Sequence, residues 1–496
     1  MKKLVYIITL LFAFQAKSLC QIYNSNGSPA SIQNDAHFLI LSGLPNCPED
    51  VIEYKNQLLK LRLSSKPTMV ANRGKNNSHL GSFSFFEQVT GVLNGTLKVA
   101  VAEGEFFFGH FTKKVNNQID LDQAKNKGQL LIELIAWDYA KQLFNFYELI
   151  GTGGSAKWFY RGDSKDILFD NQFLYRTSTP QFGRTLRCSA CHASGGPIMK
   201  ELSAPHNDWW TKQRPLSFGN AALSSQIKMA LNNIQDASTL SHAVQTASLK
   251  LQASPAYQQI KSRESLQEQL RPLFCDTEIN IESSPVGFEQ NLGSMNVSST
   301  AFLNPFFGKT NLNFSRAQYN AYLSKYGLKF PENNAADADH TYLVPVKAYS
   351  DLLAIQILLK RGIVDQEFMY DVLAVDAQNS LFSNVRCELL KLLPSTATGD
   401  WKSQFISKLK TSKMTSAQML LVNLTDPARN KNWYLKMTQQ YIAELQAKGL
   451  TDTLFQKLLR DRDAVFVSAI SQNPLGQILE PGFRVIFPVH ARRLQR

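Results

Sequence analysis

After its first residues, the sequence lacks a hydrophobic run long enough to cross a membrane. A membrane-spanning helix needs about 20 apolar residues, and the compact run Leu4–Phe14 is shorter than that. Two lysines precede this run, and the small residues Ala16 and Ser18 follow it at the positions that a signal peptidase reads. We therefore predict a secretory signal peptide, residues 1–18, and a periplasmic or secreted mature chain without a transmembrane segment, either soluble or peripheral to a membrane.

The sequence also lacks dense runs of one charge. It has 53 Lys and Arg against 40 Asp and Glu, a net charge of +13, of which the mature chain keeps +10 once the three lysines of the signal peptide are removed. No run of five or more basic residues and no nucleic-acid-binding module is present, which argues against nucleic-acid binding. The excess charge favours an acidic partner: an acidic protein, an anionic lipid surface or a polyanion.

Cysteine is scarce, with six residues in 496, and two of them belong to one short motif described below. The other four, Cys20, Cys47, Cys275 and Cys387, can form disulfides in an exported protein. Four cysteines can pair in three ways, and the sequence does not choose among them. The position of Cys275 and Cys387 in the helical half of the chain favours that pair, and Cys20 can pair with Cys47.

The mature chain divides into three parts, which together predict an α+β protein. Hydrophobic residues make up 44% and charged residues 19%, an ordinary globular composition with enough apolar mass for real cores. We predict a mixed, β-rich domain over residues 19–175, a loop-rich segment over 176–215 and a mainly α-helical domain over 216–496. No internal repeat or low-complexity tract is present.

Within these parts, the hydrophobic periodicity predicts individual elements. In the first part we expect a helix at 47–63. Strands are expected at 97–102, 105–111, 129–137, 143–150 and 157–160, forming a sheet packed on one face. In the last part we expect helices at 224–251, 315–325, 350–361, 365–375, 383–393, 416–422, 431–448 and 451–466. Residues 279–314 are rich in Asn, Ser and Gly, which favours a long loop or an irregular region.

The middle segment carries the motif Cys188-Ser189-Ala190-Cys191-His192. Two residues between the cysteines let both sulfurs reach the vinyl groups of one haem, and the following histidine is then placed under the iron as its proximal ligand. A structural zinc site needs two more ligands at matching spacing, and the sequence has no second close cysteine pair. The thioredoxin-like pattern expected around a redox dithiol is also missing. The motif therefore predicts one covalently bound haem c.

The segment Arg187–Pro197 resembles the haem-attachment segment of monohaem c-type cytochromes, and the whole chain resembles a large periplasmic cytochrome. In that family a downstream proline often offers its carbonyl to the ring N–H of the proximal histidine, which makes Pro197 a candidate for this role. The alternative is that Gly195-Gly196-Pro197 is simply a turn. The di-haem cytochrome c peroxidases have a second attachment motif, which this chain lacks.

The ligand on the other side of the iron is left open by the sequence. Met199, seven residues after His192, is the nearest candidate, and Met295 in a Gly- and Asn-containing stretch is the next. Met229 and Met369 lie in helical patterns, where methionine more often fills a core. His206 is either a second ligand, an acid–base group or a polar loop residue.

Two further features have an ordinary structural explanation that we favour. His110 lies in an aromatic strand, where a hydrogen-bonded sheet histidine is commoner than a ligand. Trp209 and Trp210 could line a haem pocket, although ordinary packing is the commoner role of such a pair.

Three functions follow from these residues. The first is electron transfer with a redox partner protein, which the positive charge suggests is acidic. The second is a monohaem oxidoreductase acting on peroxide or on a small nitrogen compound, and the third is a haem-based redox or gas sensor. The choice depends on whether the sixth position of the iron is closed by a protein ligand.

Overall fold

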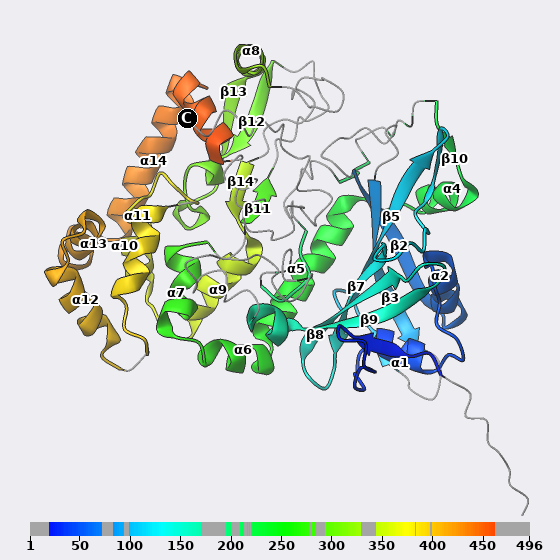
Figure 1. Ribbon diagram of the computed structural model, residues 1–496. Helices are drawn as coiled ribbons and strands as arrows, with labels where there is room; N and C mark the ends of the chain where they lie inside the picture. Colours follow the sequence, from blue (N-terminus) through cyan, green and yellow to red (C-terminus); the bar gives the residue numbers. More distant parts are fainter. Residues whose placement is uncertain are drawn as a thin grey trace, which may run out of the picture.

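The protein is described from a computed structural model. The residues that the structure describes are 19–71, 83–93, 99–169, 188, 192, 194–199, 209–212, 216, 218, 220–276, 279–282, 293–328, 344–381, 383–396 and 399–461. The predicted signal peptide, residues 1–18, lies outside them. The fold is α+β, as the sequence predicts, with the sheet in the N-terminal half and the helices mainly in the C-terminal half (Figure 1).

The N-terminal half is built on a ten-stranded sheet. Its main path runs in the order β1-β9-β8-β7-β5-β3-β2, with β4 paired to β3 and β6 paired to both β5 and β10. Neighbouring strands are antiparallel, except that β1 pairs with β9 and β10 pairs with β6 in parallel. The strands are β1 (Ile22–Asn24), β2 (Leu63–Ala71), β3 (Phe83–Leu93), β4 (Val99–Val101), β5 (Phe106–Val115), β6 (Gln118–Leu121), β7 (Leu130–Asp138), β8 (Leu143–Gly151), β9 (Ala156–Asp163) and β10 (Ala222–Leu223).

Both faces of this sheet are covered, which corrects the prediction of a sheet packed on one face. On the first face, α1 (Ala36–Ser42), α2 (Val51–Lys60) and α4 (Ser225–Asn232) share one hydrophobic core with the strands. On the second face, α5 (Ala237–Ala253) packs on the aromatic side chains of Phe107 and Phe146. Every residue of β8 is buried as a result. Burial on both faces is hard to predict from the sequence, because a strand buried on both faces has no alternation of polar and apolar residues.

The helices that cover the sheet begin at side-chain caps. Asp50 accepts hydrogen bonds from the backbone N–H groups of Ile52 and Glu53 at the start of α2, which satisfies two of the donors that a helix end leaves unpaired. The stretch 224–251 forms two helices rather than one. Ser224 caps α4, and Asp236 caps α5 by accepting from the N–H of Ser238.

The C-terminal half is mainly helical and has two cores of its own, one around α7, α10, α12 and α13 and the other around α8 and the chain after α14. Its helices are α6 (Pro255–Ser262), α7 (Leu266–Phe274), α8 (Arg316–Tyr326), α9 (Tyr349–Lys360), α10 (Gln366–Ala374), α11 (Asn384–Cys387), α12 (Trp401–Thr411), α13 (Thr415–Thr425) and α14 (Lys431–Lys448). Helix α5 lies between the two halves in Figure 1. Among the described helices, none is long and apolar enough to span a bilayer.

The predicted loop over residues 279–314 is wrong for its described part. It contains β11 (Ile279–Glu282), which pairs with β14 (Val344–Lys347), and β12 (Ser294–Ser298), which pairs with β13 (Asn311–Ser315). The 3₁₀ turns η3 (Ser299–Ala301) and η4 (Pro305–Phe307) join the second pair of strands. The strands β11, β12 and β13 do alternate between apolar and polar residues, as in Asn311–Ser315, where Leu312 and Phe314 are buried. The prediction is wrong because the Asn-, Ser- and Gly-rich composition of the stretch outweighed this period of two.

Two disulfides are present, Cys20–Cys47 and Cys275–Cys387. They are the pairs that the sequence favoured. The first ties the start of the described chain to the segment before α2, and the second joins the end of α7 to the end of α11.

Candidate functional site

A pocket lies between the second face of the sheet, α5 and the segment that carries the Cys-x-x-Cys-His motif. Its cavity volume is about 90 Å³, which is smaller than most small-molecule and cofactor sites, and part of the chain next to Cys188 and His192 lies outside the described residues. Cys188 and His192 both line it. The rest of the wall is mostly apolar and aromatic: Phe86, Phe107, Phe108, Leu130, Leu134, Ile135, Phe146, Tyr147, Pro197, Ile198, Trp209, Leu240 and Val244, with Gly109 and two glutamates.

Gly109 shapes the floor of the pocket. It is the one glycine in the aromatic strand β5, and its register partners are Phe86 on β3 and Glu133 on β7. A Cβ atom at Gly109 would lie 2.6 Å from the Phe86 ring and 3.0 Å from a Glu133 carboxylate oxygen. Both side chains therefore lean over the bare backbone, which is the usual reason for a glycine inside a strand. A single glycine among aromatic residues of a strand is the sequence signal that marks this floor.

His192 is held in a defined orientation at the pocket. Its Nδ1 lies 2.8 Å from the carbonyl oxygen of Gly196, and its ring packs against the Phe146 ring with centroids 5.3 Å apart. The backbone N–H of His192 donates to the Cys188 carbonyl at 3.0 Å. Because Nδ1–H donates to a carbonyl, Nε2 is the nitrogen with the lone pair in this tautomer.

The acceptor differs by one residue from the prediction. We expected the Pro197 carbonyl, whereas the Gly196 carbonyl makes the contact and Pro197 forms part of the pocket wall. The turn bond from the N–H of Gly195 to the His192 carbonyl, at 2.8 Å, folds the chain back so that the Gly196 carbonyl reaches the ring. The Gly-Gly-Pro segment is therefore both a turn and the partner of the histidine.

Gly195 of this turn is required by its surroundings, and Gly196 lies close to a side chain of α5. Gly195 has φ +76°, and a Cβ atom there would lie 2.8 Å from the Ser164 carbonyl oxygen. A Cβ atom at Gly196 would lie 2.9 Å from the Leu251 side chain of α5. The Tyr257 hydroxyl of α6 donates to the Ser194 carbonyl at 2.8 Å. The turn is thus held between the end of β9, α5 and α6.

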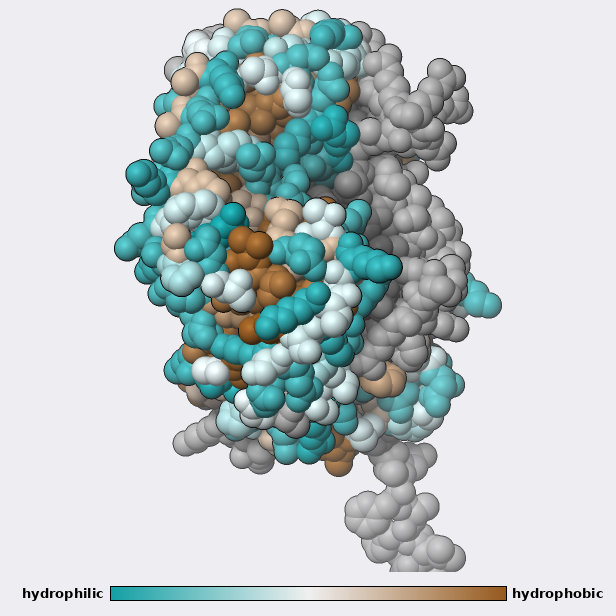
Figure 2. Space-filling view, turned by 90° about the vertical axis from the view of Figure 1, so that its left-hand side faces the viewer, coloured by the Kyte–Doolittle hydropathy of each residue, from teal (hydrophilic) through white to brown (hydrophobic). Residues whose placement is uncertain are grey.

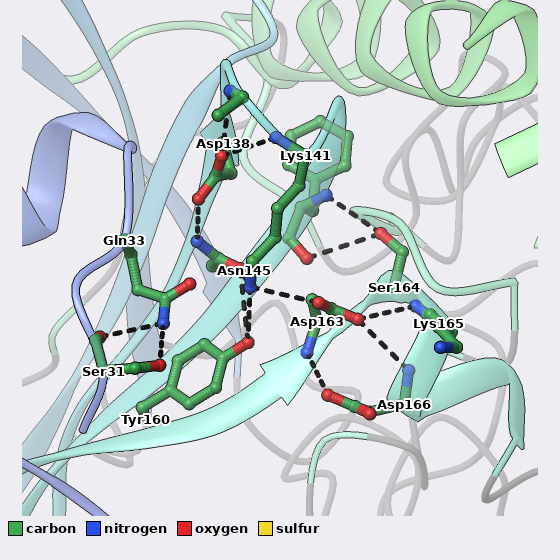
Figure 3. A network of polar contacts seen from close by, with 12 residues as sticks. Ser31, Gln33, Asp138, Lys141, Asn145, Tyr160, Asp163, Ser164, Lys165 and Asp166 are labelled. Atoms are coloured by element: carbon green, nitrogen blue, oxygen red, sulfur yellow. Dashed lines mark hydrogen bonds and ion pairs between the residues drawn. The ribbon is translucent and has the colours of Figure 1, made fainter. Parts of the chain in front are cut away.

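A polar network fixes the end of the sheet against which this turn packs (Figure 3). The Ser164 hydroxyl accepts from the N–H of Phe144 at 2.9 Å. Nearby, the Lys141 ammonium donates to Asn145, Tyr160 and Asp163 at 2.9 to 3.1 Å. These contacts join the turn between β7 and β8 to the end of β9, so the surface that meets Gly195 is rigidly supported.

Two carboxylates face each other across β7 and β8 in the pocket wall. Glu133 and Glu148 are register partners, and both line the pocket. Like charges directly opposite each other in a sheet are unfavourable. The Arg161 guanidinium offsets one of them, with Nε 2.7 Å from a Glu148 carboxylate oxygen. Groups of this kind can accept and release protons beside a bound cofactor, and sequence reasoning missed them.

The types of residue around the pocket are those that hold a c-type haem. The wall offers aromatic and aliphatic surface for a flat apolar group, a cysteine for a thioether and a histidine whose other nitrogen is hydrogen-bonded to the backbone, as metal-ligating histidines usually are. Cys191, the second predicted thioether residue, lies outside the described residues. Across the described part of the chain, no group of three or more His, Cys, Asp or Glu is placed to hold a metal ion.

The predicted sixth ligands lie in different parts of the molecule. Met199 is 1% exposed and packs in the core around the pocket, although it does not belong to the pocket wall. Met295 is on β12 in the C-terminal half, and its side chain is outside the described part. Met369 is buried in a core, as expected. Met229 is 62% exposed on α4, so the prediction that it fills a core is wrong.

The remaining candidates are placed as follows. His110 is a buried sheet histidine with Nε2 2.8 Å from Glu87, as predicted. Trp209 packs in the core on the second face of the sheet and contacts the Phe86 ring with centroids 5.5 Å apart, and it also lines the pocket. Trp210 packs in the core of the opposite face of the sheet. His206 lies outside the described residues.

Comparisons with protein-family models, with curated proteins and with solved structures give no match to this chain. The assignment of the site therefore depends on its own residues and geometry.

Proposed function

We propose that this protein is an exported c-type cytochrome that binds one haem through Cys188, Cys191 and His192 and transfers electrons to or from a redox partner protein. One observation carries the proposal. Cys188 and His192 line the same apolar pocket, and the ring of His192 is oriented there by the Gly196 carbonyl. A haem bound at this place would supply a one-electron redox centre.

The protein's own residues would set the properties of that centre. The apolar wall of Phe107, Phe146 and Trp209 would lower the polarity around the bound group, which favours the lower charge of the reduced state. The hydrogen bond from His192 to Gly196 fixes the ring and increases its basicity as a ligand. Both effects act without movement of the sheet, which suits an electron carrier.

Export is supported by the two disulfides, because such bonds persist in oxidising compartments. The predicted signal peptide and the motif point to the same compartment. The partner is expected to be acidic, since the mature chain carries a net charge of +10.

A second candidate function is supported by Glu133 and Glu148. Acid–base groups in the wall of a haem pocket would serve a monohaem oxidoreductase acting on peroxide or a small nitrogen compound, because both reactions move protons together with electrons. A sensor that reports redox state or a gas is the third function that the motif allows.

The haem itself is tested by three variants of the full exported chain. Cys188→Ala with Cys191→Ala should abolish covalent haem, measured as the pyridine haemochrome that remains after acid extraction. Ser189→Ala, inside the same motif, is the matched control and should keep it. His192→Gly should keep the thioethers and lose the axial ligand, with recovery on adding imidazole. Covalent haem in the double-cysteine variant would refute the proposal.

Carbon monoxide separates the functions. For an electron carrier we expect a low-spin spectrum of the reduced protein that carbon monoxide does not change. A high-spin spectrum that shifts on adding the gas would contradict the carrier and favour the oxidoreductase or the sensor. Turnover of peroxide or hydroxylamine that is lost in Glu133→Gln and kept in the exposed control Glu103→Gln would then select the oxidoreductase.

A further inference from the structure

One end of the helical half combines positive charge with exposed apolar side chains. This end, here named the basic tip, comprises residues 399–436, in α12, α13 and the start of α14. It contains seven Lys and Arg against two Asp. Met419, Val422 and Trp433 are 42%, 43% and 38% exposed on it. The molecule viewed from this side shows an apolar patch in the middle, bordered by hydrophilic residues (Figure 2).

Hydrogen bonds and a ring contact join these residues into one continuous surface. The Gln418 amide of α13 donates to the carbonyls of Leu409 and Ser412, at 3.1 and 2.8 Å, which places Met419 next to the lysine-rich end of α12. At the other end of α13, the Arg429 guanidinium donates to Asn423 at 2.6 Å and lies over the Trp433 ring at 5.1 Å.

The inward-facing sides of the same helices are buried in the core of the helical half. Phe405, Leu409, Leu420 and Tyr434 are buried in the core of the helical half. The exposed apolar side chains Met419, Val422 and Trp433 therefore do not contribute to this core. Lys408, Lys410, Lys413 and Lys436 are exposed around them. A tryptophan and aliphatic side chains surrounded by lysines are the composition of helices that lie in the interface of an anionic membrane.

We propose that the basic tip docks the protein on an anionic lipid surface. A protein partner for electron transfer is a poorer occupant, because electron tunnelling weakens steeply with distance and a redox partner must dock near the pocket. The pocket lies at the sheet, at the other end of the molecule from α12 and α13 (Figure 1). Docking through the tip leaves the pocket end free for such a partner. The choice of a lipid surface over a redox partner rests on the proposed function, whereas binding of the tip to vesicles requires no bound haem.

The test is binding of the full mature chain to vesicles of phosphatidylglycerol and phosphatidylcholine, measured by flotation. We expect binding to the anionic vesicles, weakened by salt, and none to pure phosphatidylcholine. Lys408→Gln, Lys410→Gln and Lys413→Gln together should weaken partitioning by about 100-fold, at roughly fivefold for each lysine near the surface. The matched control, Lys60→Gln with Lys66→Gln and Lys127→Gln in the sheet half, should bind like the wild type.

Insertion of the apolar side chains is tested separately. Brominated lipid should quench the tryptophan fluorescence of the wild type and quench it less in Trp433→Phe. Unchanged quenching in Trp433→Phe would overturn the docking geometry, and equal effects of the two triple-lysine variants would overturn the assignment to this tip. Binding to an acidic protein with no binding to anionic vesicles would identify a protein surface instead and overturn the proposal. Circular dichroism establishes that each variant is folded.

Discussion

At the scale of single residues, the site depends on a few positions whose side chains are absent or uncharged. Gly109 leaves room for the pocket floor, and Gly195 lets the motif's turn approach Ser164. His192 acts through a backbone carbonyl, so no second side chain is needed to orient it. The positions of backbone atoms decide these contacts. The motif alone therefore did not identify the Gly196 carbonyl as the acceptor for His192.

Gly195→Ala should destabilise the protein and reduce haem incorporation. The φ of +76° costs an alanine about 1–2 kcal/mol, and the contact with Ser164 adds to this. Gly153 is the matched control, because its φ is +91° and a Cβ atom there meets nothing within 4 Å. Urea unfolding should show a larger loss for Gly195→Ala than for Gly153→Ala. Equal losses would mean that the close approach at Ser164 costs nothing.

Asp35 and His37, on the first face of the sheet, are buried groups with opposite pKa shifts. Burial raises the pKa of Asp35 to about 6 against the lowering effect of hydrogen bonds from Tyr147, Phe38 and Asn145. Burial lowers the pKa of His37 to about 3. Between about pH 4 and pH 6, the folded protein therefore holds a neutral carboxyl and a neutral imidazole, whereas the unfolded chain holds a carboxylate and an imidazolium. Each state binds one proton, so the two contributions to the pH dependence cancel.

Substituting either residue should reveal the contribution of the other. In His37→Gln, the folded state alone binds the extra proton, so the free energy of unfolding should fall by about 1.4 kcal/mol per pH unit from pH 4 to 6, relative to wild type. In Asp35→Asn it should rise by a similar amount over the same window. Urea unfolding at four pH values checks this, and curves parallel to the wild type would contradict the neutral pair.

At the scale of elements, local residues determine where helices begin and end, whereas strand pairing depends on contacts between distant segments. The helix predicted over 315–325 is α8, which is capped by Ser315 and ends at Gly327 with φ +58°. The paired strands β11 and β14 are far apart in the chain, and nothing local in either of them identifies its partner. Pairing between distant segments depends on which surfaces the fold brings together, and the sequence read locally does not contain that.

The two disulfides should contribute unequally to stability. Cys275–Cys387 closes 112 residues and Cys20–Cys47 closes 27. Loop-closure entropy gives roughly 5 kcal/mol for the longer loop and about 3.5 kcal/mol for the shorter one. Cys275→Ser with Cys387→Ser should therefore lower the free energy of unfolding more than Cys20→Ser with Cys47→Ser, in denaturant titrations under non-reducing conditions. The reverse order would show that strain or residual structure outweighs the loop entropy.

At the scale of the whole molecule, the pocket is lined by the sheet, the motif segment and α5, without described residues of the later helices. All of its lining residues lie between Phe86 and Val244, and the support from Tyr257 adds α6. An exported chain that ends at Arg263 should therefore still incorporate covalent haem, measured by haem-stained electrophoresis. Its matched control carries Cys188→Ala and Cys191→Ala. Failure of a soluble, folded fragment to take up haem would assign part of the site to the C-terminal half.

The sequence by itself determined the α+β class, most of the helices and strands, the motif with His192 and the pairs of cysteines it favoured. These depend on local rules: the period of apolar residues, caps, and the fixed spacing of a short motif. The tertiary structure decided that the sheet is covered on both faces, that Gly196 rather than Pro197 meets His192, and that Glu133 and Glu148 share the pocket. Each of these depends on segments distant in the chain being packed together, and packing is a property of the folded whole.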